Sequence, residues 1–280
     1  MTYMQPKFVF FGTPPVASRT LERLLEAGYT PSLVVTSPDA PQGRGMTRTP
    51  TPVKALALSS GIPVATPEKA RDAIEEVQAT GAEYALVVAY GKILPQALID
   101  AFPLGVLNVH YSLLPKYRGA SPVEAALLNG DTVTGVAVQR MVLALDAGDI
   151  LAVKEEPILP DDTALTLRPR LIELGADTLI EALPTFIAGT TLFTPQDETL
   201  ATHCGKIPKE ARELDLSGDA SENWNKYRAY AEGPGIHFFM VKDGKRIRVK
   251  IKKASFRNGQ FIIERVVPEG KNEMDFSALR

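Results

Sequence analysis

The segment KFVFFG (residues 7–12) is a short apolar run that ends at a glycine. Apolar residues at helical spacing follow it and stop near Gly28, and a second apolar run, SLVVT (residues 32–36), comes next. The order strand, helix, strand predicts a parallel α/β sheet of the Rossmann-like type.

The same alternation continues toward the middle of the chain. Residues 84–89 are continuously apolar, which is typical of a parallel strand that is buried on both faces. The other elements that the pattern predicts are strands at 106–110 and 134–141 and helices at 122–129 and 163–189. We expect Ser121 to cap the first of these helices, and we expect Pro169 or Pro184 to break the second.

Residues 37–52 form a long connection that carries several prolines and glycines. Long connections in compact sheets tend to be lids, binding loops or disordered segments. Arg44 and Arg48 lie within this one and indicate an anionic partner.

The composition of the chain changes near residue 193. Residues 194–218 are polar and read as a linker, whereas period-two strands follow from Ile236 onward. An Asp-Gly pair at 243–244 and an Asn-Gly pair at 258–259 separate these strands and are good hairpin signals. We therefore predict a catalytic domain at 1–192, a linker at 193–207 and a smaller β-rich domain at 208–280.

Composition sets broad limits on the function. The chain has 280 residues, a formal net charge of −2 and 45% hydrophobic residues, which is ordinary for a protein with a real core. We find no apolar run long enough to span a bilayer and no secretory signal, so we expect a cytoplasmic protein. Cys204 is the single cysteine, so neither an internal disulfide nor a cysteine metal cluster can form.

Polar residues at the ends of apolar runs are the candidate catalytic groups. Asn108 and His110 share one face of a strand, at the carboxyl end where open α/β sheets bind ligands. Asp146 follows a later apolar run and precedes a glycine turn, with Asp149 as its competitor. Such a set suits acyl transfer to an amine, because the amide can stabilise an oxyanion, the imidazole can donate or move a proton, and the carboxylate can orient or charge the imidazole.

A second group of candidates follows the strand at 84–89 and should lie on the same carboxyl rim. Gly91, after Tyr90, would let backbone groups approach a flat heterocycle, while Ile93 and Leu94 would pack on its face. The alternative interpretation is that this segment simply leads into a helix that begins near Pro95.

The turn after the first strand, GTPP (residues 12–15), lacks the further glycines of the dinucleotide fingerprint. We therefore expect no NAD binding, and we interpret Gly12 as a tight turn.

A local basic excess lies between residues 242 and 257. Its basic members are Lys242, Lys245, Arg246, Arg248, Lys250, Lys252, Lys253 and Arg257. Such a stretch can attract a phosphate backbone, or it can be the solvated face of a strand.

Nearly the whole chain resembles the folate-dependent formyltransferase family. The motifs that carry the resemblance are NVH (108–110), SLLPKYRG (112–119), TGV (134–136) and LDAGD (145–149). The segments that resemble the branch of the family acting on tRNA are the Arg44 loop with PTPVK (50–54), KIPKE (206–210) and PEGK (268–271).

The resemblance implies 10-formyltetrahydrofolate as the formyl donor, the α-amine of methionyl initiator tRNA as the acceptor, and no metal. It implies an open-barrel, OB-like form for the C-terminal domain, and we expect a monomer. The implied folate contacts are Tyr90, Gly91, Ile93, Leu94, Ser112, Leu113, Leu114 and Pro115. The implied tRNA contacts are Arg44, Arg48, Lys206, Lys209, Arg248, Lys250 and Lys252.

Other functions stay open at this point. The same chemistry could formylate an amino-sugar nucleotide, although the basic strands and the Arg44 loop argue against that acceptor. A nucleotide-dependent oxidoreductase is disfavoured by the turn at residues 12–15, and a non-catalytic tRNA-binding module is disfavoured by the set Asn108, His110 and Asp146.

Overall fold

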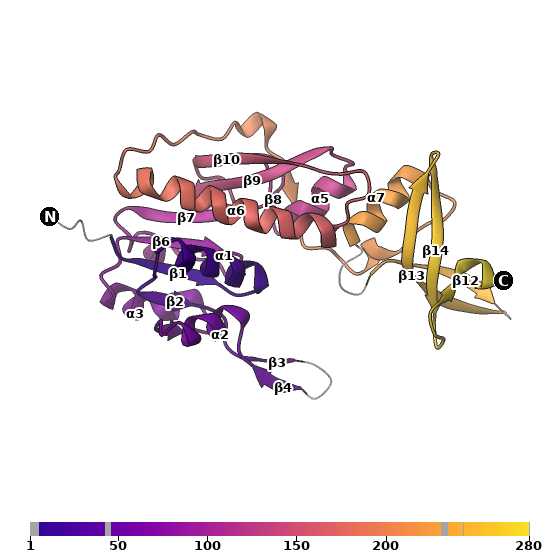
Figure 1. The fold of residues 1–280 in the computed structure, drawn as a ribbon, viewed down its shortest axis with the longest axis horizontal. Helices are drawn as coiled ribbons and strands as arrows, with labels where there is room; N and C mark the ends of the chain where they lie inside the picture. Colours follow the sequence, from indigo (N-terminus) through magenta and orange to yellow (C-terminus); the bar gives the residue numbers. More distant parts are fainter. Residues whose placement is uncertain (1–5, 43–45, 231–234, 243, 280) are drawn as a thin grey trace. The chain divides into compact units, whose positions relative to one another are not determined.

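The computed structural model describes residues 6–42, 46–230, 235–242 and 244–279 (Figure 1). The chain folds into two compact units, each drawn from several stretches of sequence. Unit 1 comprises 1–118, 135–154 and 171–201, and unit 2 comprises 119–134, 155–170 and 202–280.

A seven-stranded sheet organises unit 1. Its strands are β1 (Phe8–Gly12), β2 (Leu33–Val35), β5 (Val64–Ala65), β6 (Tyr84–Val88), β7 (Gly105–His110), β9 (Val133–Arg140) and β10 (Ile150–Pro157). The strand order is β10-β9-β7-β6-β1-β2-β5. Strands β5, β2, β1, β6 and β7 are parallel to one another, and β9 runs antiparallel to β7. Every residue of β1 and β6 is buried, so the predicted mostly parallel sheet is confirmed.

Helices follow the strands in the predicted alternation. They are α1 (Pro15–Glu26), α2 (Pro52–Ser59), α3 (Ile74–Ala79), α4 (Gln96–Ile99) and α6 (Ala164–Ile187), with 3-10 turns η1 (Ala70–Ala73) and η2 (Glu198–Leu200). The predicted break in α6 is wrong, because the helix runs through Pro169 and Pro184. Its buried leucines are Leu167, Leu171, Leu179 and Leu183. Burying them contributes about 1.5–3 kcal/mol each, which offsets a cost of about 3 kcal/mol per internal proline.

Gly12 serves close packing rather than a tight turn, which corrects the sequence interpretation. A Cβ at this position would lie 2.6 Å from the Cβ of Ala17 in α1 and 3.1 Å from the Val88 carbonyl oxygen of β6. The missing side chain therefore lets α1 approach the ends of two central strands, a role that glycines also play in dinucleotide folds.

Part of the long connection at 37–52 forms a β-ribbon. Strands β3 (Ala40–Gln42) and β4 (Thr47–Thr49) pair antiparallel, and Figure 1 shows the ribbon extending away from α2. Its antiparallel register places Pro41 opposite Arg48. Arg44 lies outside the described residues.

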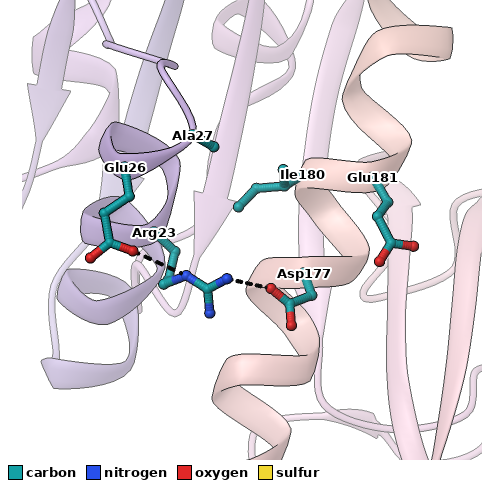
Figure 2. Close-up of a pocket in the computed structure, with 6 residues that line it drawn as sticks. All are labelled: Arg23, Glu26, Ala27, Asp177, Ile180 and Glu181. Carbon is teal, nitrogen blue, oxygen red and sulfur yellow. Dashed lines mark hydrogen bonds and ion pairs between the residues drawn. The ribbon is translucent and has the colours of Figure 1, made fainter.

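Ion pairs join α1 to α6 within unit 1. The Arg23 guanidinium contacts Glu173 and Asp177 at 2.6 Å each, and Figure 2 shows it between Glu26 and Asp177. Arg19 contacts the same Glu173 at 2.6 Å. Hydrogen bonds from both arginines hold the pKa of Glu173 below its usual range. All of these side chains are partly exposed, so we interpret the cluster as a fixed helix contact of modest strength.

Unit 2 combines two helices with a four-stranded antiparallel sheet. The helices are α5 (Pro122–Leu128) and α7 (Ala220–Tyr230), with 3-10 turns η3 (Glu210–Arg212) and η4 (Phe276–Leu279). The sheet has the order β12 (His237–Lys242), β13 (Lys245–Arg257), β14 (Gln260–Pro268) and β15 (Met274–Asp275). Two short strands, β8 (Arg118–Gly119) and β11 (His203–Cys204), form a separate pair.

Both predicted hairpins of the C-terminal sheet are confirmed. Asn258 and Gly259 have φ values of 52° and 74° between the paired ends of β13 and β14, as a two-residue primed turn requires. In the other hairpin Lys242 pairs with Lys245, and Gly244 has φ 75°. The predicted β-rich C-terminal fold is thereby confirmed.

Two details of the helices in unit 2 differ from the sequence prediction. Ser121 precedes α5, with Pro122 in the first turn, but its side chain makes no capping hydrogen bond. Helix α7 was not predicted at all. Its buried Trp224 and Tyr227 stack on each other at 5.5 Å inside a core that also holds Phe238 and Val249.

Candidate active site

Strand β7 delivers two candidate side chains to one place. Asn108 and His110 are two residues apart at the end of the strand, so both lie on the same face. Strand β6 runs parallel beside β7, with Val87 opposite Asn108, so the segments that follow both strands begin at one edge of the sheet. That edge is the carboxyl rim where α/β sheets bind ligands.

His110 and Asp146 come together, as expected from the sequence. The imidazole Nδ1 lies 3.6 Å from Asp146 Oδ2, and both side chains are nearly buried, with 7% and 12% exposure. On its other side, the ring presents Nε2 to the Tyr117 carbonyl oxygen at 2.9 Å. Two oxygen atoms, one on each side, therefore flank the ring and fix its orientation.

This geometry refines the expected role of His110. Both of its ring nitrogens face protein acceptors, so neither is directed solely toward a substrate. The side-chain amide of Asn108, unlike the ring of His110, makes no hydrogen bond within the described part of the chain, and Asn108 is partly exposed. Asn108 is therefore the donor best placed to serve a new oxyanion.

The backbone of Asp146 is held in an uncommon conformation. Its φ of 49° is left-handed, a region that costs energy for a residue with a side chain and often marks a functional site. Its competitor Asp149 is exposed, and its carbonyl oxygen accepts from the Arg140 backbone N–H. The structure thus brings Asp146, and not Asp149, to the imidazole.

Gln139 is a site residue that the sequence reasoning missed. It lies in β9 directly opposite Asn108, is 1% exposed, and donates from Nε2 to Asp146 Oδ1 at 2.9 Å. A polar residue inside the apolar strand at 134–141 was the available signal, since a buried amide needs partners.

The candidates after β6 divide into surface and core groups. Ile93 is 86% exposed, whereas Tyr90 and Leu94 are 2% and 3% exposed and belong to the hydrophobic core. Burial raises the pKa of Tyr90 to about 12. Gly91 has φ 80°, so the turn itself requires a glycine. Of the predicted folate contacts in this segment, Ile93 and the backbone around Gly91 are therefore open to a ligand.

The segment after β7 is a compact turn. Ser112 is fully buried and donates from its hydroxyl to the Lys116 carbonyl oxygen at 2.6 Å. Leu114 is buried, and Leu113 and Pro115 are partly exposed. Of the folate candidates in this segment, Leu113 and Pro115 therefore offer side-chain surface.

The loop that carries Asp146 exposes apolar side chains that the sequence reasoning did not single out. Leu143 and Leu145 are 62% and 65% exposed. Gly148 anchors the end of this loop, because a Cβ there would lie 1.7 Å from the Arg140 carbonyl oxygen. Exposed leucines beside a nearly buried His–Asp pair are consistent with a ligand-binding surface.

Most of the candidate tRNA contacts are exposed cations. Arg248, Lys250 and Lys252 belong to β13, whose intervening Val249 and Ile251 are buried on the opposite face. None of these three cations joins an ion pair within the described residues. The remaining candidates in the described part of the chain, Arg48, Lys206 and Lys209, are exposed.

His237 lies opposite Lys250 in the same sheet. Burial and the nearby Arg248 lower its pKa, so the imidazole adds little positive charge near pH 7. The positive charge of this face therefore comes from its arginines and lysines.

Within residues 6–42, 46–230, 235–242 and 244–279, no helix combines the length and apolar character that a membrane span needs. The same ranges contain no group of three or more His, Cys, Asp or Glu side chains placed to hold a metal ion.

Comparison with known proteins places these features in context. The model of the formyl transferase family matches residues 6–183. A methionyl-tRNA formyltransferase of Geobacter sulfurreducens is 40% identical over 245 residues, which are 87% of this chain and 77% of that relative.

Solved structures share the fold at lower identity. An N-formyltransferase from Helicobacter canadensis, in complex with folinic acid and dTDP-3-aminofucose, has a TM-score of 0.68 at 20% identity, covering 90% of this chain and 88% of that chain. A methionyl-tRNA formyltransferase from Clostridium thermocellum has a TM-score of 0.61 at 15% identity, covering 94% and 98%.

Proposed function

Because this chain belongs to the formyl transferase family, we propose that it transfers the formyl group of 10-formyltetrahydrofolate to the α-amine of methionyl initiator tRNA. The observation that carries the proposal is the arrangement at the end of β7. There the side-chain amide of Asn108, which makes no hydrogen bond in the described part of the chain, lies on the same strand face as His110, whose imidazole faces Asp146. Formyl transfer to an amine can use a donor for the oxyanion, a positive charge beside it and a group that accepts a proton.

The attacking amine needs little activation. A free α-amino group titrates at about 7.7–8.0, so a usable fraction is neutral near pH 7 without a strong base. Charge builds instead on the formyl oxygen when the amine attacks the formyl carbon. Asn108 donates its side-chain amide N–H to that oxygen, and His110 assists from the same face of the strand. Asp146 orients the imidazole and takes part in removing the proton from the attacking nitrogen. The tetrahedral intermediate then collapses, the bond between the formyl carbon and the folate nitrogen breaks, and that nitrogen takes up the proton as tetrahydrofolate leaves.

The carboxyl rim fits a folate donor. Ile93, Leu143 and Leu145 offer exposed apolar surface for a flat heterocycle, and the backbone around Gly91 offers hydrogen-bonding groups. Leu113 and Pro115 add surface after β7. The buried Tyr90, Leu94, Ser112 and Leu114 would act by shaping the backbone of the two segments.

The tRNA acceptor is supported by the name of the 40% identical relative and by the cations of β13. We assign residues 208–280 as the tRNA-binding domain, 193–207 as the linker and 1–192 as the catalytic domain. The protein is proposed to act as a monomer in the cytoplasm. An amino-sugar nucleotide is the second candidate acceptor, since the Helicobacter canadensis structure contains dTDP-3-aminofucose.

The test of the function is a formylation assay with purified protein and 10-formyltetrahydrofolate. Methionyl initiator tRNA should be formylated, and elongator methionyl-tRNA should be a much poorer acceptor. Formylation of a dTDP-amino sugar in place of the initiator tRNA would overturn the acceptor assignment. Absence of formyl transfer to either acceptor would overturn the proposed reaction.

The cations of β13 should bind tRNA through its phosphates. Replacing Arg248, Lys250 and Lys252 together by alanine should raise KM for methionyl-tRNA and leave kcat and the folate KM unchanged. The slope of log affinity against log salt should fall by about 1 per lost phosphate contact. Filter binding across a salt series measures both effects.

Lys253 provides the matched control, because it lies on the same strand but contacts Glu264 at 2.8 Å. Lys253→Ala should leave the tRNA affinity nearly unchanged. Equal losses for the triple variant and for this control would show that total charge, rather than this face, governs binding.

A further inference from the structure

A chain of directional hydrogen bonds ends at the carboxylate of Asp146. Its members are Glu198, Arg118, Gln196 and Gln139, and all of them lie in unit 1. Only Asp146 among these residues is part of the chemistry proposed above.

Arg118 fixes the donor-to-acceptor direction of this series of hydrogen bonds. Its guanidinium is 3% exposed and donates to both carboxylate oxygens of Glu198 at 2.9 and 2.7 Å. It also donates to Gln196 Oε1 at 3.0 and 2.8 Å. A guanidinium has no acceptor, so the amide of Gln196 must turn its oxygen toward Arg118 and its nitrogen away.

The nitrogen of Gln196 then secures the backbone around Asp146. Gln196 Nε2 donates to the carbonyl oxygens of Asp146 at 2.9 Å and Gly148 at 2.7 Å, and lies 3.4 Å from Gln139 Oε1. These contacts hold the two carbonyls on either side of Ala147 in place. They thereby stabilise the left-handed backbone of Asp146, which has φ 49°.

Gln139 completes the chain at the side chain of Asp146. Its oxygen faces Gln196, so its nitrogen faces Asp146 Oδ1, to which it donates at 2.9 Å. With Oδ1 held in this way, Oδ2 is the oxygen that faces His110 Nδ1 at 3.6 Å. Arg118 therefore sets the orientation of both glutamine amides, and these amides determine that Asp146 Oδ2 is the oxygen facing His110.

We propose that Gln139 is a positioning residue that orients the Asp146 carboxylate toward His110, with Gln196 and Arg118 fixing the orientation of both amides. The proposal rests on the proposed function for its effect on turnover, but its geometric part does not depend on the acceptor. Misplacing a reacting group by about 1 Å can cost about a hundredfold in rate.

The main variant is Gln139→Met, which keeps the length of the side chain and removes both hydrogen bonds. It should lower kcat about a hundredfold, with KM for both substrates within about twofold. In an Asp146→Asn background the same substitution should have little further effect, because the carboxylate to be oriented is already gone. If Gln139 only stabilised the fold, Gln139→Met would lower kcat by the same factor in the wild type and in Asp146→Asn.

Gln139→Glu tests the direction of the hydrogen bond. A carboxylate at this position would face that of Asp146, and the two would share a proton. The acidic limb of the kcat–pH profile should therefore move to higher pH than in the wild type. Gln196→Met supplies a second site, at which the same pattern of lost kcat and unchanged KM is expected.

Gln96 is the matched control, because its Nε2 donates to Asp100 Oδ1 at 2.7 Å on an exposed helix face. Gln96→Met removes a glutamine–aspartate bond of the same kind and should leave kcat unchanged. Thermal melting of each variant separates a loss of folding from a loss of positioning.

A readout independent of activity uses the imidazole ¹⁵N signals of the three histidines. Gln139→Met should shift the signals of His110 and leave those of His203 and His237 in place. Failure of the wild type to formylate methionyl-tRNA would count against the proposed function alone. Unchanged His110 signals, or unchanged kcat in an active enzyme, would overturn the positioning role.

Discussion

Replacing Asn108 by alanine should lower kcat about a hundredfold or more, with KM for 10-formyltetrahydrofolate changed by less than about twofold. The reason is that one oxyanion donor contributes about 2.7–4 kcal/mol to the transition state and little to the ground state. Asn108 is the donor concerned, because both nitrogens of the neighbouring His110 already face acceptors in the protein. Single-turnover formylation with saturating substrates measures the effect on the chemical step.

Asn108→Asp sharpens the test, since it keeps the shape of the side chain but places negative charge beside the developing oxyanion. Its loss should exceed that of Asn108→Ala. The exposed Asn272 serves as a control, and Asn272→Ala should behave as the wild type. A near-normal single-turnover rate for Asn108→Ala would remove this residue from the mechanism.

Replacing Asp146 by asparagine should lower kcat by a factor on the order of 10⁴, because an isosteric Asp→Asn change beside a catalytic imidazole has an effect of that size elsewhere. The substitution removes the negative charge that faces His110 Nδ1 at 3.6 Å. It also places a second donor against Gln139, which already donates to Oδ1 at 2.9 Å. The measurement is kcat across the pH range, with both substrates saturating.

Asp149→Asn is the companion variant, because Asp149 lies three residues away on an exposed turn. It should retain kcat within about twofold. The reverse result, an active Asp146→Asn and an inactive Asp149→Asn, would move the carboxylate role to Asp149.

Local signals predicted the strands and turns of this chain well. The run at 7–12 and the continuous apolar stretch at 84–89 became buried parallel strands, because such runs can be satisfied only inside a covered sheet. Asn258-Gly259 became a hairpin turn, since that pair tolerates positive φ at both positions.

The errors arose where tertiary contacts overrode local preference. Pro169 and Pro184 did not break α6, because the buried leucine stripe of that helix outweighs two lost hydrogen bonds. The proline-rich segment at 37–52 pairs with itself as β3 and β4, and no strong period-two pattern announces that pairing.

The candidate site was predictable in part. Asn108, His110 and Asp146 carry chemistry that their residue types reveal, and the structure brings the last two to 3.6 Å. Gln139 and Gln196 were missed, because a glutamine has no distinctive chemistry until its partners are known. The Gln196 bonds to Asp146 span about fifty positions of sequence, a distance over which no local pattern operates.

Helix α5 has a consequence for how this gene can be recombined. Residues 122–128 precede the whole of α6 in sequence, yet α5 packs on α7 at 220–230, and Gly130 beside it leaves room for Asn225. A hybrid joined within 193–207 would therefore match one parent's α5 to another parent's α7. Exchange of the C-terminal portion between relatives should succeed only when these two helical surfaces are inherited together.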